Sequence, residues 1–233
     1  LYPILCQLTR REKCSMKISE YFPIWDQLTA EQQKWLEQSA VYRELPKGTV
    51  IHSGELDCLG MILVEHGRLR AYMISDEGRE ITIYRLLERD ICLFSASCML
   101  KNIQFEITVE TETDAAVRII PPAGFKRLME ESAPMANYVN QLMAGRFSEV
   151  VWLMEQIMWK SFDSRLAAFL LEECMLEETE VLKITHEKIA DHLGTAREVV
   201  TRMLRYFQGE GMVRLSRGTV EILDEKKLGQ LAK

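Results

Sequence analysis

Five polar side chains share one face of the helix that the pattern predicts over 195–208. Thr201, Arg202 and Arg205 follow Glu198 by three, four and seven residues, and Arg197 lies beside them. An arginine can donate two hydrogen bonds to guanine, and a glutamate can accept one from the amine of cytosine. This face therefore predicts a helix that reads base edges in the major groove of DNA.

A short helix and a tight turn precede this predicted recognition helix. Thr185 is suited to cap a helix that ends at Leu193, and Gly194 follows where glycine adopts a left-handed backbone most easily. Thr195 and Glu198 have the spacing of a capping box at the start of the next helix. Two helices joined by a glycine turn predict a helix-turn-helix, which favours DNA reading over a merely solvated helix face.

A β-hairpin wing is expected after the recognition helix. The runs 212–215 and 219–223 flank a turn, and Arg214 and Arg217 are placed to contact DNA phosphates. The net charge of the whole chain is −6, so any DNA-binding surface must be a local basic patch. The alternative for Glu198 and Arg202 is an ordinary surface ion pair that serves solubility alone.

The middle of the chain predicts an antiparallel β structure. Between Val41 and Pro121 the hydrophobic period changes to two, with expected strands at 49–52, 61–65, 68–74, 80–87, 106–112 and 116–120. Asp76-Glu-Gly78 predicts a hairpin turn in which Gly78 adopts a positive φ. Short, regularly spaced strands of this kind predict a jelly roll, so the fold class is α+β.

A long apolar helix is expected over 134–159, with a length of about 40 Å. Its apolar positions recur close to a heptad seam that Arg146 interrupts. A partner subunit would cover such a helix better than a small sheet, so we expect a homodimer; the alternative is a long helix that links two domains within one chain. The predicted dimer residues are Val139, Met143, Phe147, Val150, Leu153, Met154 and Ile157.

The predicted domain organisation has four parts. They are an N-terminal extension (1–20), an effector-sensing β-roll (21–133), the dimerisation helix (134–160) and a winged helix-turn-helix (161–233). Thr29 and Gln32 form a capping box at the start of a helix in the second part. No apolar run is long enough to cross a membrane, and the charge order at the N-terminus is the reverse of a secretory signal. We therefore expect a cytoplasmic protein whose cysteines are reduced.

On these residues the chain resembles the CRP/FNR family of transcription regulators. Ile189-Ala-Asp-His-Leu-Gly194, followed by Ala196-Arg-Glu-Val-Val-Thr-Arg-Met-Leu204, is similar to the helix-turn-helix of that family. Arg197, Glu198 and Arg202 match its base-reading positions, whereas Ala196 and Val199 depart from the commonest form. The resemblance implies a homodimer that binds palindromic double-stranded DNA, contacts RNA polymerase and is not an enzyme.

The resemblance is weaker at the effector site. Family members that bind cyclic nucleotides carry a Gly-Glu pair for the ribose and an Arg-Ser pair for the cyclic phosphate. An ungapped comparison places Leu93-Phe94 and Gln104-Phe105 at those positions, and Val150 and Val151 where the long helix would meet the purine. Glutamine lacks the charge of arginine and phenylalanine lacks a hydroxyl donor, so we expect that cAMP does not bind.

Other cofactors are not indicated. An iron–sulfur cluster would need clustered cysteines near the N-terminus, and Cys6 and Cys14 are far apart. Haem would need an axial histidine or cysteine, for which His52 and His66 are candidates in principle. A metal-dependent enzyme on a cupin-like roll is an alternative function, but these two histidines are fourteen residues apart. A cyclic-nucleotide module that regulates a partner is a further alternative.

The identity of the effector stays open at this point. Cys92 and Cys98 could form a thiol pair that senses an oxidant or a metal, or they could be small buried apolar residues. An apolar pocket for an aromatic or fatty acid ligand is a third possibility. The candidate effector or redox residues are Cys92, Phe94, Cys98, Gln104 and Phe105.

Overall fold

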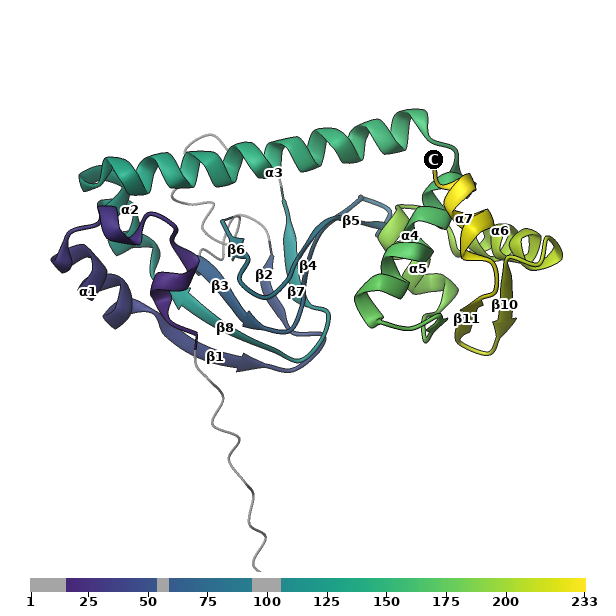
Figure 1. Ribbon diagram of the computed structural model, residues 1–233, viewed down its shortest axis with the longest axis horizontal. Coiled ribbons are helices and arrows are strands. Elements are labelled where there is room, and N and C mark those ends of the chain that lie inside the picture. Colours follow the sequence, from purple (N-terminus) through teal and green to yellow (C-terminus); the bar gives the residue numbers. More distant parts are fainter. Residues whose placement is uncertain (1–15, 54–58, 94–105) are drawn as a thin grey trace, which may run out of the picture.

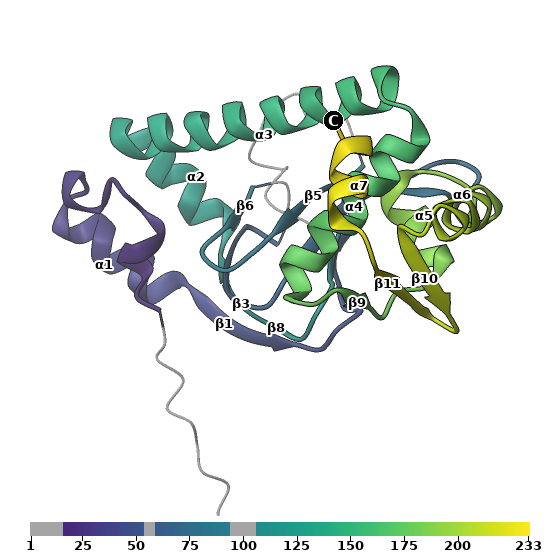
Figure 2. The same cartoon turned by 45° about the vertical axis from the view of Figure 1, so that its right-hand side comes forward.

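A computed structural model describes residues 16–53, 59–93 and 106–233 of the chain. A β-roll occupies the N-terminal half and a smaller helical lobe the C-terminal third, and the long helix α3 (Ala133–Trp159) runs along both of them (Figures 1 and 2). No helix in these ranges is both long enough and apolar enough to span a lipid bilayer. The roll and the C-terminal lobe face each other beneath α3.

Two four-stranded antiparallel sheets form the roll. The strands are β1 (Val41–Leu45), β2 (Val50–Ser53), β3 (Met61–His66), β4 (Leu69–Ile74), β5 (Glu80–Leu86), β6 (Ile91–Cys92), β7 (Thr108–Thr111) and β8 (Ala115–Ile120). Their orders are β1-β8-β3-β6 and β2-β7-β4-β5. The sheets pack face to face, because alternate residues of both, such as Ile62, Val117, Leu69 and Val109, share one buried cluster.

Helices cover the other face of the first sheet. α1 (Ala30–Ser39), α2 (Pro122–Glu131) and the start of α3 bury Leu36, Phe125 and Met135 against Met61 and Leu63 of β3. Two 3₁₀ turns, Ile18–Tyr21 and Trp25–Gln27, precede α1. The roll therefore begins before residue 21, and the predicted extension to residue 20 was too long, since the apolar side chain of Ile18 is buried in this cluster.

The sequence predicted the main strands but missed several elements. The six predicted runs each overlap an observed strand, and Gly78 has the expected positive φ, 78°. β1 was missed because it is an edge strand whose Val41 and Tyr42 are exposed, so its pattern is not that of a half-buried strand. The short β6, α2 and the last helix α7 (Glu225–Leu231) were missed as well.

The C-terminal lobe contains the predicted winged helix-turn-helix. It consists of α4 (Phe162–Glu177), β9 (Val181–Leu182), α5 (His186–Leu193), α6 (Arg197–Gly209), β10 (Val213–Ser216), β11 (Thr219–Ile222) and α7. The side chain of Thr185 caps α5 by accepting a hydrogen bond from the amide of Lys188 (3.1 Å), and Gly194 ends it in the left-handed region. Both local predictions are confirmed.

The predicted capping box at Thr195 is wrong. α6 begins at Arg197, and its N-cap is Ala196, an extended residue without a side-chain hydrogen bond. The left-handed Gly194 and the amide of Thr195, which donates to the carbonyl of Ala190, still belong to the end of α5. Thr195 therefore lies one residue too early to cap α6.

Two predicted dimer residues in the first half of α3 pack against the roll. Val139 is 1% exposed and packs in the core that α1 and α2 share with the roll, and Met143 packs at the edge of both roll clusters. Val139 is therefore covered within the chain and Met143 is covered in part, because the N-terminal part of α3 lies on the roll. The free apolar face begins after Arg146.

Gly194 offers a test of the helix-turn-helix turn. We expect Gly194→Ala to lower the free energy of unfolding of the C-terminal lobe by about 1–2 kcal/mol, because φ is +66° and a Cβ would lie 2.8 Å from Cδ1 of Ile81. Gly209→Ala, where a Cβ meets nothing within 4 Å, is the matched control and should be neutral or stabilising. Urea unfolding of both variants is the measurement, and equal midpoints would contradict the assignment.

Candidate nucleic-acid interface

The recognition helix α6 separates into two faces. Val200, Leu204 and Phe207 are fully buried against the rest of the C-terminal lobe. The opposite face presents four exposed charged side chains, namely Arg197, Glu198, Arg202 and Arg205. A single amphipathic helix thus anchors itself through apolar contacts and leaves its arginines free to approach a base edge.

Thr201 differs from its predicted neighbours, because its hydroxyl is already engaged. It donates to the carbonyl oxygen of Arg197 and accepts from Nδ1 of His186, both at 2.9 Å. Burial, with Arg197 and Arg205 nearby, lowers the pKa of His186 below its ordinary value. Thr201 therefore ties α6 to the start of α5 rather than presenting a free hydroxyl to a base.

A cavity of about 540 Å³ lies between the start of α5, the first residue of α6 and the tip of the wing. It is lined by Thr185, His186 and Glu187 at the start of α5, by Arg197, which lies 4.0 Å from the carboxylate of Glu187, and by Arg217 at the tip of the β10–β11 hairpin. Exposed guanidinium groups and a helix N-terminus both attract anions, so a DNA phosphate fits the chemistry of this cavity. Arg214 on β10 is paired with Glu221 across the hairpin (2.8 Å), which leaves Arg217 as the freer of the two predicted wing contacts.

The candidate effector region is described only in part. Phe94, Cys98, Gln104 and Phe105 lie outside the described residues. Cys92 on β6 is fully buried, and burial with this thiol nearby raises the pKa of Tyr84 well above its ordinary value. Solvent oxidants do not reach a thiol in this position, which favours the interpretation of Cys92 as a small core residue.

Arg146 occupies the space between α3 and the roll. Its guanidinium lies 4.5 Å from the centre of the Tyr84 ring and forms an ion pair with Glu149 (2.7 Å). The charge that interrupts the predicted heptad seam is thus satisfied by stacking and by a carboxylate within the chain.

The two histidines considered for haem or metal do not form a site together. His52 lies on β2 and is buried, whereas His66 ends β3 in the other sheet and pairs with Glu88 on the surface (2.5 Å). Within the described ranges no group of three or more histidine, cysteine, aspartate or glutamate side chains is arranged to hold a metal ion.

Comparisons with known proteins agree with this geometry. Residues 42–132 match the cyclic nucleotide-binding domain family, and residues 164–231 match the Crp-like helix-turn-helix domain family. Together these matches cover the roll and the C-terminal lobe. The chain is 28% identical to the transcriptional regulator SdrP of Thermus thermophilus, over 72% of this chain and 82% of that protein. It is 25% identical to the cyclic AMP receptor protein of the same organism, over 82% and 87% of the two chains.

A solved structure is more similar still. A crystal structure described as a CRP/FNR-family transcriptional regulator from Eubacterium rectale is 57% identical, with a TM-score of 0.89, and the match covers 91% of this chain and 98% of that one. The fold, both domain matches and this relative lead to one conclusion. The chain belongs to the CRP/FNR family of transcriptional regulators.

Proposed function

We propose that the protein is a homodimeric, sequence-specific transcription regulator that reads a palindromic site with α6 and responds to a signal other than cAMP. The observation that carries the proposal is the exposed basic face of α6, held at a left-handed glycine turn beside an exposed wing arginine. Two copies would place their recognition helices in successive major grooves, about 34–36 Å apart. RNA polymerase is the further partner that we expect for such a regulator.

The free face of α3 supports the homodimer. Phe147, Val151, Met154 and Met158 recur at steps of three and four on one face and are 70%, 46%, 54% and 64% exposed; Trp152, Ile157 and Trp159 are exposed beside it. Aromatic side chains bury about 150–250 Å² each when they are covered, so this surface is large enough for a stable contact. A second copy of α3 supplies the same surface in return, as a two-fold interface requires.

A charge in the proposed α3 interface should dissociate the dimer. We expect Phe147→Glu to weaken self-association by about 3 kcal/mol or more, because each interface would bury an unpaired carboxylate. Sedimentation equilibrium measures this change. Met175→Glu on α4 is the matched control, since Met175 is 74% exposed and lies off α3. Equal dissociation of both variants, or a wild-type monomer, would contradict the proposed interface.

Mutation of the arginines on α6 can distinguish base reading from simple electrostatic attraction to DNA. We expect Arg197→Ala and Arg202→Ala each to cost about 1–3 kcal/mol of specific binding and to relax specificity at one base position. Sites are selected from random duplex DNA, then titrated with their single-base variants at fixed salt. Arg127→Ala, which removes an exposed arginine paired with Glu131 on α2, is the control. Uniform weakening across all sequences would argue against base reading.

The proposal of a signal other than cAMP rests on two observations. Gln104 and Phe105 replace the expected phosphate ligands in the sequence, and the arginine of α3 that faces the roll is already stacked on Tyr84 and paired with Glu149. Neither the pair Gln104 and Phe105 nor the arginine of α3 offers a free cationic group to a cyclic phosphate.

Calorimetric titration with cAMP should therefore show no saturable heat at micromolar ligand. The cyclic AMP receptor protein of T. thermophilus, which is named for that ligand, provides the comparison. Saturable micromolar binding by the present chain would overturn this part of the proposal.

A further inference from the structure

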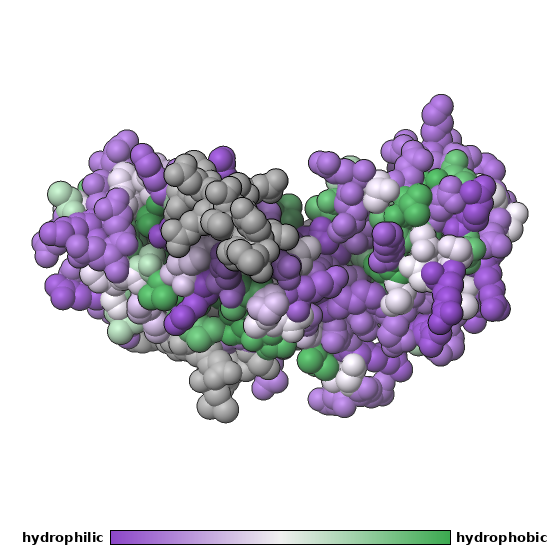
Figure 3. Space-filling view, turned by 90° about the horizontal axis from the view of Figure 1, so that it is seen from below, coloured by the Kyte–Doolittle hydropathy of each residue, from purple (hydrophilic) through white to green (hydrophobic). Residues whose placement is uncertain are grey.

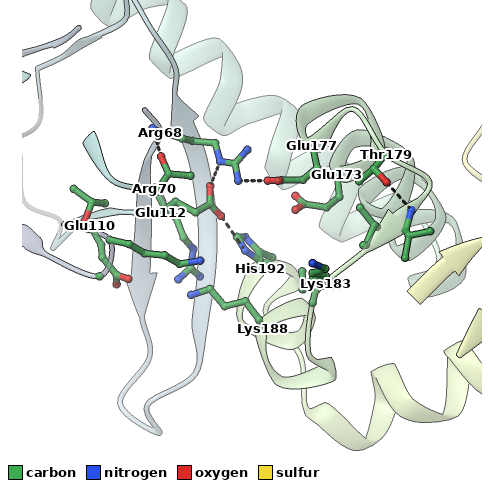
Figure 4. A pocket seen from close by; sticks show the side chains of 17 residues that line it. Arg68, Arg70, Glu110, Glu112, Glu173, Glu177, Thr179, Lys183, Lys188 and His192 are labelled. Carbon is green, nitrogen blue, oxygen red and sulfur yellow. Dashed lines mark hydrogen bonds and ion pairs between the residues drawn. The ribbon is translucent and has the colours of Figure 1, made fainter. Parts of the chain in front are cut away.

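The C-terminal lobe rests on the outer face of the sheet β2-β7-β4-β5, and charged side chains fill the contact (Figure 4). The roll contributes Arg68, Arg70, Arg85 and Glu112, and the lobe contributes Glu173, Glu177 and His192. A cavity of about 640 Å³ borders this cluster. Most of the molecular surface opposite α3 is hydrophilic, with only scattered apolar patches (Figure 3).

The contact fixes the helix-turn-helix itself. Arg70, whose side chain is 1% exposed, donates from Nη2 to the carbonyl oxygen of Asp191 on α5 (2.9 Å). Ile81 on β5 forms an isolated β-bridge with Leu193, and its side chain fills the space beside Gly194. The turn between α5 and α6 is therefore seated on β5, so the roll determines the orientation of the recognition helix.

The side chains around His192 favour one tautomer of its neutral ring. Nε of Arg70 donates to Oγ1 of Thr82 (2.7 Å), and the same Oγ1 lies 2.8 Å from Nδ1 of His192. Nε2 of His192 then faces Oε1 of Glu112 at 3.3 Å and carries the ring proton. A carboxylate only accepts, so the neutral ring carries its proton on Nε2 and its Nδ1 accepts the hydroxyl proton of Thr82. A second proton on Nδ1 would turn the hydroxyl of Thr82 away and would lie beside the guanidinium of Arg85, whose Nη2 is 3.5 Å from Nδ1.

The surroundings of His192 also disfavour its charged form. Its side chain is 3% exposed and its ring lies 5.2 Å from that of Phe169 on α4. Burial, together with Arg85 on β5 and Arg70 on β4, lowers the pKa of His192 to about 4, although the bond to Glu112 opposes the shift. On its own helix, Lys188 and Asp191 are the nearest charged groups along the chain.

The contact between the lobes also shifts the pKa of two carboxyl groups in the cluster, those of Glu112 and Glu173. Burial would raise the pKa of Glu112, but hydrogen bonds from His192 and Arg85 hold it far below its ordinary value. Burial raises the pKa of Glu173 on α4, against the attraction of Arg85. Acidification therefore strengthens docking through Glu173, whereas loss of the Glu112 charge weakens docking only at more acidic pH.

We propose that His192 is a proton-sensitive latch: the neutral ring holds the helix-turn-helix lobe on the roll, and protonation of Nδ1 releases it. The inference rests on the proposed function only in taking this lobe as the DNA-binding part. The proton acts here as a regulatory ligand whose site lies at the contact between the two lobes.

The sign and size of the effect follow from linkage. A histidine with pKa about 4 when docked and 6.5 when released favours release as the pH falls below 6.5. With these values the docking equilibrium falls about 4-fold between pH 7.5 and 6.0, and about 10-fold by pH 5.5. This window lies above the range in which Glu112 loses its charge.

Hydrogen exchange on the full chain measures the release. We expect the protection factor of residues 186–196, corrected for the intrinsic effect of pH, to fall by up to about 4-fold from pH 7.5 to 6.0, since the titration of Glu173 reduces the change that His192 alone would produce. Residues 212–223 of the wing belong to the same lobe but not to the contact, and they serve as the internal reference. Their protection should stay constant, which shows that the lobe remains folded.

Variants show whether the titration of His192 causes the pH dependence. His192→Gln cannot be protonated and should lose the pH dependence, while His186→Gln, the matched histidine change in the same lobe, should keep it. Glu173→Gln should steepen the pH dependence, because it removes the opposing titration. If His192→Gln unfolds the lobe, the histidine ring signals of wild type and Thr82→Val give the test: the pKa of His192 should be well below 6.5 in wild type and higher in the variant.

The outcomes that overturn the latch are clear. Equal pH dependence in wild type and His192→Gln, or a His192 that titrates at 6.5 or above in the folded chain, would refute it. Failure of the proposed function would give a different result, because a protein that selects no DNA site would still show the pH-dependent protection of residues 186–196.

Discussion

The carboxylate of Glu112 and the guanidinium of Arg85 form the ionic centre of the contact between the two lobes. Glu112 accepts hydrogen bonds from Nε of Arg68 (2.6 Å) and Nε of Arg85 (2.9 Å), and it faces Nε2 of His192 in the other lobe. Its side chain is 10% exposed. Removing one partner from such a buried cluster leaves the remaining charges uncompensated, which is far more costly than losing a surface ion pair. The geometry of the whole contact therefore depends on the place of this residue, which the backbone bond from its amide to the carbonyl of Arg68 fixes at the end of β7.

A bulge in β5 places the other members of the cluster. Ala71 pairs with Tyr84 and Tyr72 with Thr82, so Ile83 is an extra residue in the ladder. Beyond this bulge the strand reverses its alternation, and Thr82 and Arg85 both face the C-terminal lobe although they are three residues apart. Tyr84 instead points to the interior, where Arg146 of α3 stacks on it. One strand thus contacts the long helix, the core of the roll and the turn of the helix-turn-helix.

Local chemistry made much of this fold predictable. The capping residues Thr29 and Thr185 and the glycine at 194 act within a few residues, and α6 reveals its two faces through its own periodicity. No local sequence pattern of this kind indicates the contact between the lobes. Arg68, Glu112 and His192 are far apart in the chain, and charged residues that alternate along a strand usually face solvent. Only the tertiary arrangement shows that this polar face is covered.

The pairing of charges explains how an acidic protein presents a basic surface. Most arginines of the roll and the arginine of α3 are matched by nearby carboxylates, as Arg85 is by Glu173 and Arg118 by Glu65, so they contribute little field at a distance. Arg202, Arg205 and Arg217 form no ion pair with any residue that the structure describes. Their charges are therefore not neutralised within the chain, and they lie on the recognition helix and the wing tip. The net charge of −6 limits attraction to DNA elsewhere on the surface, and these unpaired arginines direct it to one face.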